Sequence, residues 1–146
     1  MKTVTAALII LNKKILIARR ASNVPYSGFY EFPGGKVEEN ETHEEALNRE
    51  LNEELGINCS IENFFTEIKW GGFLLKSYFV DMNEEDVSKM EKRVHDDFQW
   101  VNLENYTEYK LLPADVEIME MLKDSSKSWL VCNPINLMPP KTNFLS

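Results

Sequence analysis

The first third of the chain consists of short apolar runs separated by polar turns. Residues 3–11 and 14–19 are two such runs, and the polar residues between them predict a hairpin. Residues 21–28 contain Ser, Asn, Pro and Gly, as loops do. The run 29–32 predicts a short third strand, closed by Pro33 and the glycines that follow it. The chain is therefore expected to begin with a hairpin, a loop and a short strand.

A second pair of strands is expected in the middle of the chain. Residues 57–70 and 73–81 flank Gly71 and Gly72, and two adjacent glycines are a signal for a hairpin turn. Residues 82–97 are highly charged, which predicts a loop with room for one helical turn. Residues 98–101 predict another short strand.

Residues 42–56 predict a helix with clear ends. Thr42 and Glu45 form the T-x-x-E pattern of a capping box, with Thr42 as the N-cap. Gly56 is placed to end the helix, because glycine readily adopts the left-handed conformation found at that position. Three leucines recur every fourth residue and form one apolar stripe: Leu47, Leu51 and Leu55.

A second helix is expected over residues 113–123. Four of its apolar residues are expected to face inward: Val116, Met119, Met121 and Leu122. We expect residues 1–124 to form one domain and residues 125–146 to be a C-terminal tail of unknown role. The order of the elements predicts an α+β fold, a sandwich with a mixed β-sheet between helices.

The composition and net charge of the chain argue against several classes of protein. A chain of 146 residues fits one domain. The net charge of -8 and the pI of about 4.8 argue against binding a nucleic acid polymer. Cys59 and Cys132 give neither a disulfide framework nor metal-ligand spacing, so both are expected to be reduced thiols in a cytoplasmic protein. A hairpin explains the apolar start better than a signal peptide, and no run is long enough for a membrane span.

The predicted first helix carries a cluster of carboxylates. Glu50, Glu53 and Glu54 stand at i, i+3 and i+4, so they share one face and repel one another. Arg49 is the only lysine or arginine between Thr42 and Gly56. A solvated acidic face would explain this spacing, but a hard cation such as Mg²⁺ would relieve the repulsion as well. The adjacent glycines before the helix favour the second reading, since they let the backbone approach a ligand closely.

Together these residues read G-x5-E-x7-R-E-U-x-E-E-x-G-U, where U is aliphatic. The positions are filled by Gly35, Glu41, Arg49, Glu50, Leu51, Glu53, Glu54, Gly56 and Ile57. This segment resembles the Nudix box, the defining motif of the Nudix hydrolase family. Residues 16–20, 31–36 and 112–115 resemble the MutT-like branch, which includes enzymes of the 8-oxo-dGTP diphosphatase and CTP pyrophosphohydrolase types. The resemblance covers roughly residues 3–123 and implies a Nudix-type α/β/α sandwich.

The resemblance implies a site that binds Mg²⁺ or Mn²⁺. Its implied metal ligands are the carbonyl of Gly34 and the carboxylates of Glu50, Glu53 and Glu54, with Glu53 as either a ligand or a base. Its implied catalytic residues are Glu53, Glu50 and Arg49, of which Arg49 orients the glutamates. Glu41 is implied to fix the loop.

Many relatives carry a further metal-binding acid six residues before a strand tryptophan. Counting back from Trp100 gives Val94, which cannot bind a metal ion. We therefore expect Asp96 or Asp97 to serve instead, unless Glu91 does so or the site uses fewer ligands. His95 is equally well explained as an ordinary loop residue.

Four residues are expected to bind the substrate: Arg20, Gly35, Lys36 and Asp115. An ionised Asp115 would accept from an amino group such as cytosine N4, and a protonated one could also read guanine. It is equally well explained as a helix N-terminal acid that stabilises the helix dipole. Tyr30, Phe32 and Trp70 are expected to pack in the core rather than to stack on a base.

The resemblance implies Mg²⁺-dependent hydrolysis of a nucleoside triphosphate, either oxidised dGTP or a CTP-like or dCTP-like nucleotide. The products would be a nucleoside monophosphate and pyrophosphate, as in sanitation of the nucleotide pool. ADP-ribose or a dinucleoside polyphosphate is an alternative substrate, although Gly72 and Leu74 stand where those subgroups usually have proline and tyrosine. A non-catalytic nucleotide-binding module is a further alternative, but such modules generally lose box glutamates. The expected protein is a monomer or homodimer that binds a small nucleotide and no membrane.

Overall fold

The computed structural model describes residues 1–132, and the side chains of residues 1–125. The elements in chain order are β1 (Lys2–Leu11), β2 (Lys14–Arg20), β3 (Tyr30–Glu31), β4 (Gly34–Lys36), α1 (His43–Leu55), β5 (Ser60–Trp70), β6 (Phe73–Asp81), α2 (Glu84–Ser88), β7 (His95–Val101), the 3₁₀ turn η1 (Tyr106–Glu108) and α3 (Pro113–Cys132).

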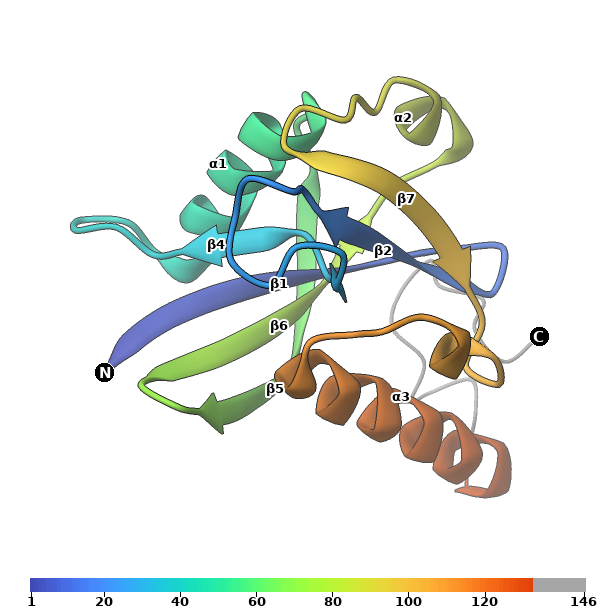
Figure 1. The fold of residues 1–146 in the computed structure, drawn as a ribbon. Coiled ribbons are helices and arrows are strands. Elements are labelled where there is room, and N and C mark those ends of the chain that lie inside the picture. The colour runs from blue at the N-terminus through green and yellow to red at the C-terminus, as the bar shows by residue number, and fades with distance from the viewer. Residues whose placement is uncertain (133–146) are drawn as a thin grey trace.

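The strands form one mixed sheet between two helices. Its central order is β3-β2-β1-β6-β5, while β4 pairs with β1 and β7 pairs with β2. The β1–β6 pair is parallel and the other pairs are antiparallel. Helices α1 and α3 lie on opposite sides of the sheet (Figure 1). The predicted α+β sandwich with a mixed sheet is therefore confirmed.

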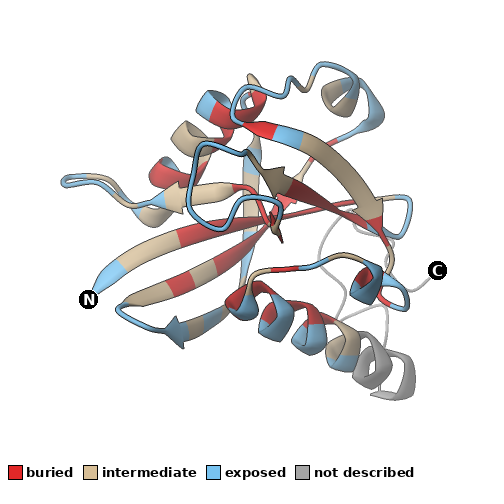
Figure 2. Cartoon of the chain, in the orientation of Figure 1, coloured by how far each residue is buried: buried red, intermediate tan, exposed pale blue. Residues whose placement is uncertain are grey.

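Strand β1 contributes to the core on both faces of the sheet. Successive side chains of a strand point to opposite faces. Leu8 and Ile10 accordingly pack in the cluster that includes Ile118 of α3. Ala7 and Ile9 pack in the other cluster, beside three fully buried leucines of α1, Leu47, Leu51 and Leu55. Figure 2 shows the buried residues concentrated along the strands and on the inner sides of both helices.

Both predicted hairpins are present. Asn12 and Lys13 adopt positive φ angles of 52° and 67° between β1 and β2, as a two-residue turn of twisted strands requires. Trp70 pairs with Phe73 across the second turn, between β5 and β6.

Helix α1 begins and ends where its sequence predicts. The Thr42 hydroxyl accepts a hydrogen bond from the Glu45 backbone N–H at 3.1 Å, and the Glu45 carboxylate accepts one from the Thr42 N–H at 2.8 Å. Gly56 ends the helix with a φ of 73°. These caps satisfy backbone groups that would otherwise lack partners at the helix ends.

Helix α3 differs from its prediction in length and orientation. It continues to Cys132 rather than ending at residue 123, because no glycine or proline interrupts residues 114–132. Residues 124–132 therefore belong to a helix, and the rest of the predicted tail, 133–146, lies outside the described residues. Val116 and Met121 are 36% and 39% exposed, so their predicted inward orientation was wrong. The buried stripe comprises Ala114, Asp115, Ile118, Met119 and Leu122.

Strands β4, β5 and β7 differ most from their predictions. Residues 34–36 form β4 rather than a turn, because they pair with Val4, Thr5 and Ala6 of β1. Strand β5 begins at Ser60 rather than residue 57, and β7 begins at His95 rather than residue 98. The early start of β7 comes from its pairing with Arg19 and Arg20. No helix among residues 1–132 is long and apolar enough to cross a membrane.

Candidate active site

Strand β4 brings two adjacent glycines against the acidic face of α1. The Glu50 carboxylate lies so close to Gly35 that a Cβ atom on this residue would overlap it. The Gly34 N–H donates to Glu54 Oε1 at 3.4 Å. The structure thus brings together Gly34, Gly35, Glu50 and Glu54 from opposite ends of the sequence motif.

The three glutamates of this face differ in their exposure to solvent. Side-chain exposure is 9% for Glu54, 18% for Glu50 and 58% for Glu53. Glu54 and Glu50 therefore line the interior of the site, whereas Glu53 lies at its solvent edge.

Arg49 connects the box residues. Its Nε and one terminal nitrogen bind both oxygens of Glu41 at 2.7 and 3.0 Å, a bidentate arrangement with fixed geometry. Its other terminal nitrogen lies 2.9 Å from Glu50 and 3.4 Å from Glu53. The terminal nitrogen that binds Glu41 also donates to the Lys36 carbonyl at 3.0 Å. Arg49 therefore joins α1 to the loop before it and to β4.

Burial raises the pKa of Glu54 above its ordinary value, and the hydrogen bond and charge of Glu50 raise it further. A divalent cation would favour the ionised form of both carboxylates, so this pair fits a hard metal ion. Among the described side chains, those of residues 1–125, however, no three acidic, histidine or cysteine side chains converge as a preformed metal site.

The two aspartates expected to supply a further ligand lie elsewhere. Asp96 is an exposed partner of Arg19, with 2.6 Å between their side chains. Asp97 accepts from the Tyr30 hydroxyl at 2.6 Å and from the Gln99 amide at 2.9 Å. The structure therefore does not bring either carboxylate to Glu50 and Glu54.

His95 and Glu31 lie in the site although sequence reasoning did not select them. His95 is buried, its Nε2 lies 2.9 Å from Glu31 and its Nδ1 lies 3.9 Å from Glu54. The opposite oxygen of Glu31 binds Arg20 at 2.8 Å. The pairing of Arg20 with His95 across β2 and β7 creates this arrangement. Only that long-range pairing brings His95 to the site, because no local sequence pattern marks it.

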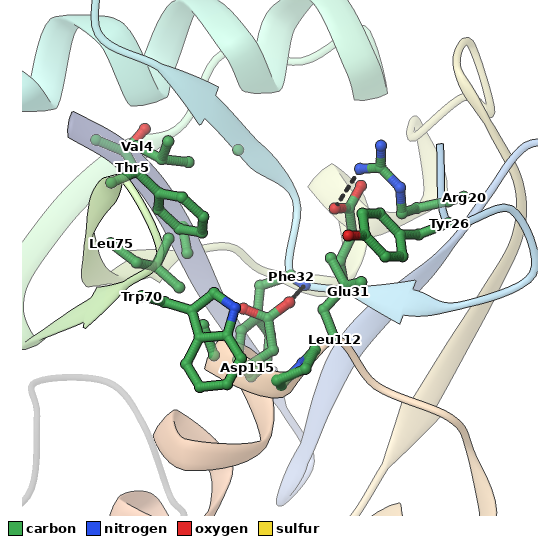
Figure 3. A pocket seen from close by; sticks show the side chains of 15 residues that line it. Val4, Thr5, Arg20, Tyr26, Glu31, Phe32, Trp70, Leu75, Leu112 and Asp115 are labelled. Carbon is green, nitrogen blue, oxygen red and sulfur yellow. Dashed lines mark hydrogen bonds and ion pairs between the residues drawn. The ribbon is translucent and has the colours of Figure 1, made fainter. Parts of the chain in front are cut away.

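A cavity of about 390 Å³ lies beside these residues, between the sheet and the start of α3. Its apolar lining includes Phe32, Trp70 and Leu112, and its polar lining includes Asp115 and the Arg20–Glu31 pair (Figure 3). Trp70 is 44% exposed, so the expectation that it packs in the core was wrong, whereas Phe32 is buried. Tyr30 is buried in the core as expected.

Asp115 is a buried acid on the wall of this cavity. It accepts a hydrogen bond from the Phe32 N–H at 3.3 Å. Burial, with a smaller contribution from the charge of Glu31, raises the pKa of Asp115 well above its ordinary value. The side chain therefore favours the protonated form, which both donates and accepts hydrogen bonds.

A second cavity of about 180 Å³ lies beside Glu54 of the acidic face. Both cavities are lined by Arg20, Glu31 and Gly34, and the second is also lined by Glu54 and His95. Lys36, the remaining residue expected to bind substrate, is exposed at the end of β4. The site therefore combines an apolar cavity with an adjacent group of carboxylates.

Comparison with known proteins agrees with this fold and site. The NUDIX domain model matches residues 1–122. The CTP pyrophosphohydrolase of Escherichia coli is 33% identical over 121 residues, which cover 80% of this chain and 87% of that protein. The 8-oxo-dGTP diphosphatase of Proteus vulgaris is 53% identical over 57 residues, covering 38% and 51% of the two chains. The solution structure of the E. coli ORF135 protein matches with a TM-score of 0.74 at 30% identity, covering 92% of this chain and 94% of that one.

The chain belongs to the Nudix family and is a hydrolase of that family. The predicted resemblance and the Nudix-type fold are thereby confirmed. Nudix hydrolases act on small nucleotide substrates and generally depend on divalent metal ions.

Proposed function

We propose that this protein hydrolyses a nucleoside triphosphate to a nucleoside monophosphate and pyrophosphate, with Mg²⁺ or Mn²⁺ as cofactor. The favoured substrates are 8-oxo-dGTP and CTP or dCTP. The main support is the position of the cavity beside Asp115, which shares three lining residues with the cavity beside Glu54. A base in the first cavity would place its phosphates toward the carboxylates. The names of the two relatives support the same substrate class.

The residues of the acidic face have different proposed roles in hydrolysis. When bound, the divalent ion neutralises phosphate charge and makes bound water more acidic. Glu50, Glu54 and the Gly34 carbonyl would hold this ion, and Arg49 would keep the carboxylates in place. Glu53 would accept the proton of the attacking water. The water oxygen forms a bond to one phosphorus of the α–β linkage while the bond from that phosphorus to the bridging oxygen breaks, and the bridging oxygen leaves with the electron pair.

Asp115 is the proposed base-reading residue. A protonated carboxyl can donate to guanine O6 and accept from its N1–H, or donate to cytosine N3 and accept from its N4 amino group. Trp70, with an exposed ring on the cavity wall, would contact the face of the base. One protonated acid thus serves both proposed substrate types.

A nucleotide panel tests this function. The full chain is incubated with Mg²⁺ and, separately, CTP, dCTP, 8-oxo-dGTP, dGTP or ADP-ribose, and the products are separated by chromatography. We expect a monophosphate and pyrophosphate, in equal amounts, from CTP, dCTP or 8-oxo-dGTP. Release of orthophosphate from the triphosphates, or turnover of ADP-ribose alone, would refute the proposal.

A further inference from the structure

His95 is held by one of its ring nitrogens only. Nε2 lies 2.9 Å from Glu31 Oε2, and Arg20 binds the other oxygen of the same carboxylate at 2.8 Å. An ionised carboxylate can only accept hydrogen bonds, so Nε2 is the ring nitrogen that donates. In a neutral imidazole this leaves the lone pair on Nδ1.

The Nδ1 atom is buried and has no hydrogen-bond partner among the described residues. The His95 side chain is only 4% exposed. A buried polar atom without a partner destabilises a fold and requires an explanation. Its neighbour is Glu54 Oε1 at 3.9 Å, and both residues line the smaller cavity. The Nδ1 atom and the Glu54 oxygen therefore face each other across a gap that is too long for a direct hydrogen bond.

We propose that His95 Nδ1 is a ligand of the divalent cation, together with the Glu54 carboxylate. This inference rests on the metal dependence within the proposed function. Metal bonds of ~2.1 Å from each atom span at most ~4.2 Å, so a separation of 3.9 Å leaves room for a cation. A metal-bound histidine typically donates its other N–H to a carboxylate, which is the role that Glu31 has here. Glu31 and Arg20 then act as positioning residues that fix the orientation of the ring.

An imidazole ligand changes which cation the site prefers. Mg²⁺ favours oxygen ligands, whereas imidazole nitrogen favours transition metals, with affinity rising from Mn²⁺ to Co²⁺. We therefore expect Mn²⁺ and Co²⁺ to bind this site more tightly than Mg²⁺.

Pulsed electron paramagnetic resonance of bound Mn²⁺ tests the assignment directly. The full chain is prepared with ordinary and with ¹⁵N-labelled histidine and loaded with Mn²⁺ alone. A directly bound histidine produces a nitrogen coupling that changes with the isotope. The chain contains 2 histidines, so His43→Gln is the matched control. His43 lies at the start of α1, where its ring contacts Tyr78 at 3.5 Å.

We expect the isotope-sensitive coupling in the wild-type protein and in His43→Gln. Its persistence in His43→Gln assigns it to His95 even if a His95 variant does not fold. His95→Gln, whose amide can still reach Glu31, should lose the coupling and bind Mn²⁺ at least about tenfold more weakly. Circular dichroism melting would show whether that variant is folded.

Two results would overturn the inference, and only one of them would also refute the proposed function. Mn²⁺ bound without histidine coupling, with affinity lost in Glu54→Gln, removes His95 as a ligand and leaves the proposed function intact. Absence of Mn²⁺ binding that depends on Glu54 refutes both.

Discussion

Individual residues of the acidic face occupy different environments although they share one helical turn. Glu54 is buried against Gly34, Glu50 lies against Gly35, and Glu53 is exposed beside Arg49. Burial makes the charge of Glu54 costly without a cation, whereas Glu53 stays in contact with water. Single substitutions should therefore separate metal binding from folding.

Glu54→Gln should fold normally but lose at least about a hundredfold in kcat/KM, because it removes a proposed metal ligand. The amide keeps the volume of the side chain and can still accept from the Gly34 N–H, so the Tm should not fall. Turnover and thermal melting of the same preparation would check both. Glu44→Gln, an exposed change on the same helix, should leave turnover unchanged. Full activity of Glu54→Gln would contradict the metal assignment.

Gly35→Ala should reduce activity by about tenfold or more, because the added Cβ would occupy the space of the Glu50 carboxylate. The stability cost should stay below about 1 kcal/mol, since the end of a glutamate side chain can move. Gly72→Ala is the matched control, because a Cβ on that turn residue meets no atom within 4 Å. The comparison requires kcat/KM and Tm for both variants. Equal activities would show that the position of Glu50 is unimportant.

Asp115→Asn should stabilise the protein increasingly as pH rises. The pKa of Asp115 is higher in the folded state than in the unfolded state. The contribution of this group to the stability of the wild-type protein is therefore lost as the pH rises from the unfolded-state pKa to the folded-state pKa. Asparagine does not titrate and can still accept from the Phe32 N–H. The Tm difference between variant and wild type should grow as the pH rises above about 4, the ordinary pKa of an aspartate. An exposed control, Asp124→Asn, should show no such trend.

At the scale of elements, α1 and β4 form the site as one unit. Arg49 joins them through Glu41, Glu50 and the Lys36 carbonyl, and the caps at Thr42 and Gly56 fix the helix ends. The position of the glutamates therefore depends on contacts made by the whole loop and helix.

Arg49→Lys should lower kcat/KM by about tenfold or more while the helix still forms. Lysine lacks the planar fork that binds both oxygens of Glu41 and also reaches Glu50. Arg19→Lys is the control, because its partner Asp96 is on the surface and such pairs contribute little. Circular dichroism and steady-state kinetics would measure both effects. Wild-type kinetics in Arg49→Lys would show that the network does not orient the glutamates.

The sequence predicts elements whose signals are local and misses those that depend on distant pairing. The caps and leucine stripe of α1 lie within fifteen residues, so both ends of the helix were predicted correctly. Strand β4 was missed because only its pairing with β1 makes Gly34–Lys36 a strand. For the same reason, the motif gives the glutamates but no local pattern marks His95. The prediction that Trp70 packs in the core was wrong, because an aromatic residue in a strand does not show which face of the sheet is covered by a helix.

At the scale of the whole molecule, one cavity lies between the sheet and the start of α3, and the other lies beside Glu54 near the end of α1. Ligands that occupy both would contact residues from β2, β3, β4, α1 and α3. Binding of metal or nucleotide should therefore stabilise the fold as a whole.

Divalent cations should raise the Tm in a concentration-dependent way. A ligand at a hundred times its Kd adds about 2.7 kcal/mol, which corresponds to a shift of roughly 5–10 °C for a domain of this size. Melting curves with Mg²⁺, Mn²⁺ and Co²⁺ would measure the shift, and Glu54→Gln should abolish most of it. A cation effect that is equal in wild type and Glu54→Gln would indicate binding elsewhere.

The most direct test of the account is a crystal structure with Mn²⁺ and a non-hydrolysable nucleoside triphosphate analogue, using the anomalous signal to place the metal. The account predicts Mn²⁺ between Glu54, Glu50 and the phosphates, with the base in the cavity beside Asp115. Metal and phosphates bound away from Glu50 and Glu54, with these carboxylates facing solvent, would contradict it.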